Sequence, residues 1–69
     1  MKLKNGAHLK QIRKKVGLSQ EGLTFEINKR LSGGWKNSIS YRTIARLENG
    51  QKSWKKSGEL IKIIEEVLG

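Results

Sequence analysis

The sequence of 69 residues contains no cysteine, no aspartate and a single histidine, His8. The lack of cysteine excludes disulfide bonds, and one histidine leaves too few of the usual ligands for a zinc site. Without aspartate there is no Ser/His/Asp catalytic set, and Gly33-Gly34 lacks the preceding strand that would make it a phosphate-binding loop. The sequence therefore predicts a protein that is not an enzyme, with no catalytic residues, no metal, no cofactor and no small-molecule substrate.

Long apolar runs are also absent. No run reaches membrane length, and Met1-Lys2-Leu3-Lys4 is followed by polar residues rather than by the apolar segment of a signal peptide. We therefore expect a cytoplasmic protein with no membrane partner. Its length allows one domain with a small core, over residues 1–69, in which residues 1–5 are predicted to form a flexible basic arm.

Charge is what the sequence has in excess, with a formal net of +9. Residues 1–58 hold fourteen basic residues against three glutamates, a net of +11, whereas residues 59–69 hold one lysine against three glutamates, a net of −2. A basic body with a mildly acidic end indicates a polyanion bound on one side. Four lysines are predicted to be solvent-exposed surface residues with no binding role: Lys2, Lys4, Lys14 and Lys62.

Apolar residues recur at helical spacing in several segments, which predicts an all-α fold of four helices without strands. The first helix runs from about Ala7 to Val16 and ends at Gly17. Ser19 is predicted to cap the second, which reaches about Arg30, and Leu18 can pack on its first turn. Ser57 is predicted to cap a last helix that continues to the end of the sequence.

The segment from Ile39 to Gly50 organises the rest of the chain. At helical spacing Ile44 and Leu47 face inward, while an aromatic and basic edge made of Tyr41, Arg42 and Arg46 can point outward. Ser40 is a candidate N-cap, and Gly50 supplies the left-handed residue that closes such a helix. Together with the helix before it, this segment is interpreted as a helix-turn-helix whose second helix enters the DNA major groove.

Residues 9–23 (LKQIRKKVGLSQEGL), residues 40–50 (SYRTIARLENG) and the apolar last helix together resemble the phage repressor and Cro class of helix-turn-helix regulators. The resemblance covers residues 9–27 and 39–69. It implies a small repressor-like domain of four or five helices that binds double-stranded DNA and regulates transcription, in the nucleoid, with a prophage or mobile-element origin.

The resemblance also implies roles for individual residues. Those at its base-reading positions are Ser40, Tyr41, Arg42 and Arg46, and each arginine can fork onto guanine O6 and N7. Candidate phosphate contacts are Gln20, Thr43, Asn49, Lys52, Lys55 and Lys56, to which a connecting segment adds Lys36. Arg13 and Glu48 match an internal ion pair that ties the first helix to the end of the recognition helix.

Two features depart from the family pattern. About ten extra residues, from Asn28 to Asn37, separate the second helix from the recognition helix. They either form a wing, with Trp35 against the DNA backbone, or extend the second helix, with Trp35 covering the core. The family also commonly continues into a fifth helix that forms the dimer, whereas this sequence ends at Gly69. Binding as a monomer and dimerisation on DNA through an apolar part of the last helix (Leu60, Ile64 or Leu68) both stay open.

Three other functions remain alternatives to a sequence-specific regulator. An architectural or recombination-accessory protein would bend DNA with weak sequence preference. An antitoxin or antirepressor would use the helix-turn-helix surface or the last helix to bind a protein. A basic amphipathic membrane binder is disfavoured because the basic helices carry no exposed apolar stripe. The operator sequence and the sign of regulation cannot be read from these residues.

Overall fold

The computed structural model describes residues 1–31 and 38–69. They form four α-helices and one short 3₁₀ turn: α1 (Gly6–Lys15), α2 (Gln20–Arg30), α3 (Tyr41–Glu48), η2 (Lys55–Ser57) and α4 (Gly58–Leu68). No strand occurs within the two described ranges, which confirms the predicted all-α fold. In the same ranges, no helix combines the length and the apolar character that crossing a bilayer requires.

Local sequence signals set most of the helix ends. Gly17 adopts a φ of 81° just after α1, a conformation that glycine reaches without the penalty of a side chain. Ser19 then caps α2, since its hydroxyl accepts a hydrogen bond of 2.9 Å from the backbone N–H of Gly22. Leu18 is half-buried against the core beside this cap. These ends agree with the predictions.

Two of the predicted helix caps do not form their capping bonds, and one cap that was not predicted is present. Ser57 precedes α4, but its hydroxyl donates to the carbonyl oxygen of Ser53 at 2.7 Å and makes no capping bond within the described backbone. Ser40 occupies the N-cap position of α3 and likewise makes no capping bond to the described backbone. By contrast, Asn5 caps α1 by accepting from the N–H of His8 at 2.9 Å. An asparagine at this position has the short acceptor that helix starts favour.

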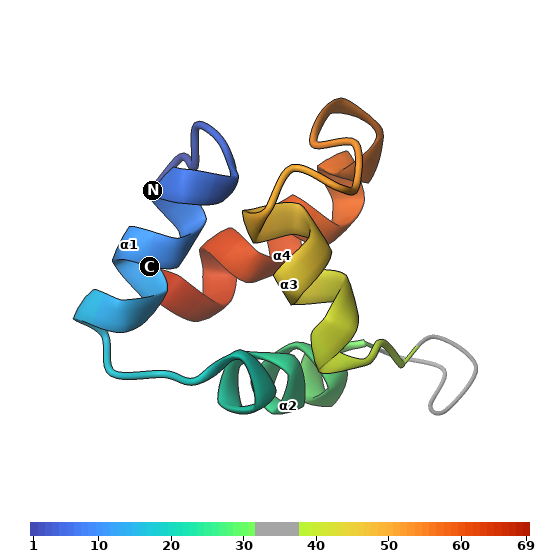
Figure 1. The fold of residues 1–69 in the computed structure, drawn as a ribbon. Helices are drawn as coiled ribbons and strands as arrows, with labels where there is room; N and C mark the ends of the chain where they lie inside the picture. Colours follow the sequence, from blue (N-terminus) through green and yellow to red (C-terminus); the bar gives the residue numbers. More distant parts are fainter. Residues whose placement is uncertain (32–37) are drawn as a thin grey trace.

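The predicted flexible arm over residues 1–5 is instead packed onto the body. Leu3 is only 4% exposed and belongs to the core, and its N–H donates to a carboxylate oxygen of Glu65 at 2.7 Å. Burying the Leu3 side chain gains about 1.5–3 kcal/mol, enough to hold a short segment in place. The two chain ends consequently lie close together beside α1 (Figure 1).

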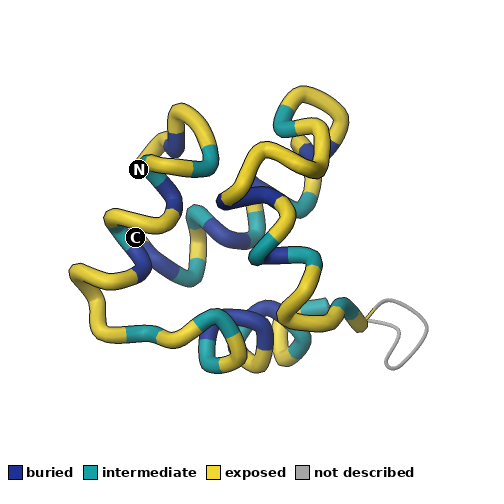
Figure 2. Tube along the Cα trace, in the orientation of Figure 1, coloured by how far each residue is buried: buried dark blue, intermediate teal, exposed yellow. Residues whose placement is uncertain are grey.

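The core is a single cluster that takes apolar side chains from all four helices. Its six fully buried members are Leu9, Leu23, Ile27, Ile44, Leu47 and Ile64. Within this cluster α2 packs against both α3 and α4, and α1 packs against α3. In Figure 1, α3 rises away from α2 and overlaps α4, and Figure 2 shows the buried positions on the inner sides of the helices.

The apolar face of α4 is used internally. Ile64 is fully buried and Leu68 is 7% exposed, while Leu60 is half-buried against the same core. Of the three residues considered for dimerisation on DNA, Ile64 and Leu68 therefore offer almost no exposed surface, and only Leu60 is partly accessible. These side chains face inward because the small domain needs every large apolar residue of α4 to close its core.

Candidate nucleic-acid interface

Helix α3 has one buried face and one exposed face. Ile44 and Leu47 are fully buried, and the exposed face carries all four predicted base-reading residues: Ser40, Tyr41, Arg42 and Arg46. The Tyr41 side chain is 44% exposed, an unusual position for a ring that could otherwise have packed into a small core. The helix thus presents one aromatic ring and two guanidinium groups to solvent together, as the spacing predicts.

A buried ion pair fixes the C-terminal end of α3 to α1. The Nε of Arg13 lies 2.6 Å from Oε2 of Glu48, with side-chain exposures of 8% and 1%. The same guanidinium reaches Oε1 of Glu48 at 3.2 Å and donates to the carbonyl oxygen of Leu18 at 2.8 Å. The guanidinium therefore binds both carboxylate oxygens and also uses a third N–H group on a backbone carbonyl. A buried ion pair needs such additional hydrogen bonds to offset the cost of removing its charges from water. The predicted Arg13–Glu48 pairing is confirmed.

Gln20, predicted as a phosphate contact, joins this network. Its Nε2 donates to Oε1 of Glu48 at 3.1 Å, so the first turn of α2 is tied to the last turn of α3. A side-chain amide carries two N–H donors, and this bond uses one of them. Gln20 is half-buried, with its position set by Glu48 rather than by solvent.

The start of α1 makes an unusually close approach to the end of α3. A Cβ at Gly6 would overlap the carbonyl oxygen of Leu47 and lie 2.9 Å from both Cα and the carbonyl oxygen of Glu48. Only glycine allows this approach, because the obstructing atoms are backbone. Together with the Arg13–Glu48 pair, the contact fixes the last turn of α3 against α1.

The chain leaves α3 through a hydrogen-bonded turn. Gly50 has a φ of 77°, its N–H reaches the carbonyl oxygen of Leu47 at 3.4 Å, and the carbonyl oxygen of Arg46 accepts from the N–H groups of Gln51 at 2.8 Å and Lys52 at 3.2 Å. This pattern is a Schellman motif, and it confirms Gly50 as the closing residue. It places Lys52 directly beside the last turn of α3.

The basic segment that follows α3, residues 51–56, is anchored to the core by Trp54. Trp54 is half-buried against the core, while Lys52, Lys55 and Lys56 are exposed. A shallow hollow of about 620 Å³ lies where this loop meets α3 and α4, and the predicted phosphate contacts among its lining residues are Thr43, Lys52 and Lys56. The hollow is thus lined by one threonine of α3, two lysines from the segment after it, and Glu59 of α4.

The chain enters α3 through a contact that the sequence did not suggest. The side-chain oxygen of Asn28, in the last turn of α2, accepts from the N–H of Ile39 at 2.9 Å. The amide nitrogen of the same side chain donates to the carbonyl oxygen of Ile39 at 3.0 Å. The side chain thus pairs with both backbone groups of one residue, as a neighbouring strand would. The partners are eleven positions apart, so no short-range motif indicates the pairing.

The remaining predicted contacts are placed unevenly. Asn49 is exposed at the end of α3, whereas Lys36 and Trp35 lie outside the described residues. Asn28 to Arg30 belong to α2. Lys29 and Arg30 each lie 3.6 Å from a carboxylate oxygen of Glu26.

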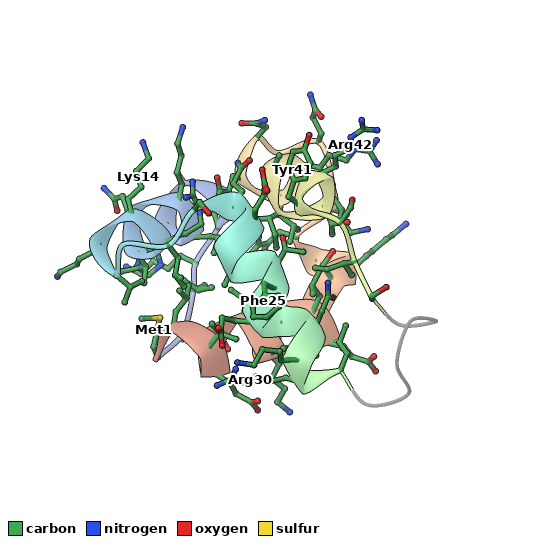
Figure 3. All side chains as sticks on the ribbon, turned by 90° about the horizontal axis from the view of Figure 1, so that it is seen from below. Met1, Lys14, Phe25, Arg30, Tyr41 and Arg42 are labelled. Atoms are coloured by element: carbon green, nitrogen blue, oxygen red, sulfur yellow. The ribbon has the colours of Figure 1, made fainter. Side chains whose placement is uncertain are left out.

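Figure 3 bears on Lys14, which the sequence analysis expected to be no more than a solvated surface residue. The Lys14 side chain of α1 projects from the same edge of the molecule as Tyr41 and Arg42, while Arg30 lies at the opposite edge (Figure 3). The edge of the molecule that carries Tyr41 and Arg42 therefore also carries a lysine of α1. This juxtaposition of elements is invisible in the sequence, where Lys14 lies between other charged residues.

Comparisons of this chain with protein-family models, with curated proteins and with solved structures found no match.

Proposed function

We propose that this protein is a sequence-specific double-stranded DNA-binding regulator of transcription, of the phage repressor and Cro type, that works in the cytoplasm on the nucleoid. Helix α3 lies in the major groove in this proposal, with Arg42 and Arg46 on guanine edges and Tyr41 on a thymine methyl group or a phosphate. The protein would act by occupying an operator and so excluding or recruiting other proteins.

One observation carries the proposal. Tyr41, Arg42 and Arg46 are exposed together on a helix whose other face is locked by Ile44, Leu47 and the Arg13–Glu48 pair. Base readout requires donors that are held in place yet free of internal partners, and among the described residues Glu48 pairs with Arg13 of α1 rather than with Arg42 or Arg46. An exposed face built only for solubility would not need a helix fixed so firmly from behind.

Phosphate contacts would supply much of the affinity. Lys52, Lys55 and Lys56 follow α3 on an exposed loop, and Lys14 lies at the same edge as Arg42. Gln20 retains one amide N–H beyond its bond to Glu48, which a phosphate oxygen could accept. Since phosphate contacts release counterions, binding should weaken steeply as salt rises.

A protein-binding role, as in an antitoxin or antirepressor, is the second candidate. It is favoured by Phe25 on α2, whose side chain is 63% exposed, with the Lys29 ammonium 5.4 Å from the ring centroid. An aromatic ring kept in solvent is costly to leave uncovered and is enriched at protein interfaces. In this role Phe25 rather than α3 would carry the binding energy.

Selection of bound sequences from random DNA duplexes, at about 150 mM salt, separates the two candidates because exposed charges are well screened there. Enrichment of a defined motif by the parent protein, unchanged by Phe25→Ala, is the result expected for a regulator. If no motif is enriched, the sequence-specific proposal fails. Weak, motif-free binding with DNA bending would then favour the architectural alternative, and no DNA binding would favour the protein-binding one.

A further inference from the structure

The two ends of α3 are secured by different means. At the C-terminal end, Leu47 is in the core, Glu48 is paired with Arg13, and the turn around Gly50 is fully hydrogen-bonded. At the N-terminal end, Ser40 makes no capping bond to the described backbone. With only eight residues, α3 has little cooperative length to resist fraying from this uncapped end.

What secures the N-terminal end is the side chain of Asn28. It holds the N–H of Ile39 at 2.9 Å and the carbonyl oxygen of Ile39 at 3.0 Å, so both backbone groups of Ile39 are fixed to α2. The backbone at Asn28 is held in position because the preceding residue, Ile27, is fully buried in the core. The Ile39 side chain also packs on the core. Three contacts therefore fix the residue that lies directly before Ser40.

We propose that Asn28 is a positioning residue that sets where Tyr41 and Arg42, but not Arg46, meet DNA. This inference rests on the proposed function. Ile39 lies two residues before Tyr41, so a displacement at Ile39 passes directly into the first turn of α3. Arg46 lies near the other, independently secured end. Direct base contacts tolerate a displacement of only about 0.5 Å, so a modest shift of the first turn would be enough to weaken them.

The first test needs no DNA and uses the full chain with Asn28→Leu, which keeps the approximate size and removes both hydrogen bonds. Amide hydrogen exchange of Ile39 and Thr43, whose N–H donates to Ser40 at 3.1 Å, should become about tenfold faster, the factor expected for one lost hydrogen bond. Exchange of Asn49, whose N–H donates to Ala45 at 3.0 Å, should not change. Equal acceleration at both ends, or none, would overturn the proposal.

Thr24→Val is the matched control. It removes another side-chain hydrogen bond of α2, the 2.8 Å bond from the Thr24 hydroxyl to the carbonyl oxygen of Gln20, which lies wholly within α2. It should leave the exchange of Ile39 and Thr43 unaltered. If Asn28→Leu does not fold, Asn28→Asp replaces it, since a carboxylate still accepts from the N–H of Ile39 but cannot donate to its carbonyl oxygen. Faster exchange is then expected at Thr43 and not at Ile39.

The second test repeats the duplex selection with Asn28→Leu and Thr24→Val. Base pairs whose preference depends on Arg42 should lose about tenfold discrimination in Asn28→Leu, within what one base contact supplies, and those that depend on Arg46 should keep theirs. If the parent enriches a motif and Asn28→Leu relaxes all of its positions equally, or none of them, the proposal is overturned while the proposed function stands. If the parent enriches no motif, the proposed function and the specificity claim both fail, while hydrogen exchange still decides whether Asn28 holds the start of α3.

Discussion

The guanidinium of Arg13 on α1 forms an ion pair with the carboxylate of Glu48 at the end of α3, with Nε 2.6 Å from Oε2 and both side chains nearly excluded from solvent. Two residues separated by 35 positions are thereby joined at the C-terminal end of α3. Because Gln20 donates to the same carboxylate, the start of α2 is fixed to this point too. The pair is thus a structural anchor behind the exposed face rather than a part of it.

Replacing Arg13 by alanine should destabilise the fold by about 3–5 kcal/mol, because the carboxylate of Glu48 would stay buried without its cation. Urea denaturation followed by circular dichroism would measure this loss. Lys10→Ala is the matched control, since it removes a positive charge from an exposed position of the same helix and should change stability by less than about 0.5 kcal/mol. Superimposable curves for Arg13→Ala and the parent would refute an anchoring role.

Gly6→Ala should also destabilise the protein, by about 1–3 kcal/mol, because the new methyl group would meet the backbone of Leu47 and Glu48. The contrast is Gly58→Ala at the start of α4, where the backbone is helical and no described atom lies within 4 Å of a Cβ. That substitution should stabilise by about 0.4–1 kcal/mol. Thermal melts that rank the two variants in the opposite order would show that α1 does not approach α3 so closely.

The loop lysines should act on affinity and on its salt dependence. Lys52→Ala, Lys55→Ala or Lys56→Ala should each weaken binding to all duplexes alike and lower the slope of log K against log salt by about 1. Lys62→Ala, on α4, serves as the control and should leave the slope unchanged. Fluorescence anisotropy over a salt series would measure these slopes. A slope that stays constant in every loop variant would remove these residues from the phosphate-contact set.

Features were predicted correctly from the sequence when the residues that form them lie close together along the chain. Ser19, Gly17 and Gly50 act within a few residues of their own position, so cap and turn chemistry located them correctly. The two faces of α3 likewise followed from helical periodicity. The Arg13–Glu48 pair, by contrast, spans the fold and came only through the resemblance to the repressor class.

The missed features depend on tertiary contacts. Nothing next to Asn28 in the sequence indicates that Ile39 is its partner. Gly6 appears to be an ordinary helix-start glycine until α3 is placed against it. Leu3 was assigned to a flexible arm because lysines surround it, yet one large apolar side chain was enough to dock the segment. Ser57 had the residue type of a cap, but its hydroxyl found a nearer carbonyl at Ser53.

The central claim is that the exposed face of α3 reads bases, and the most direct measurement compares the duplex motifs enriched by the parent, Arg42→Ala and Arg46→Ala. Each variant should lose preference at its own base pairs, by about 1–3 kcal/mol per contact, and keep the rest of the motif. Uniform weakening in both variants, with an unchanged motif or with none in the parent, would contradict the claim and make the arginines phosphate contacts.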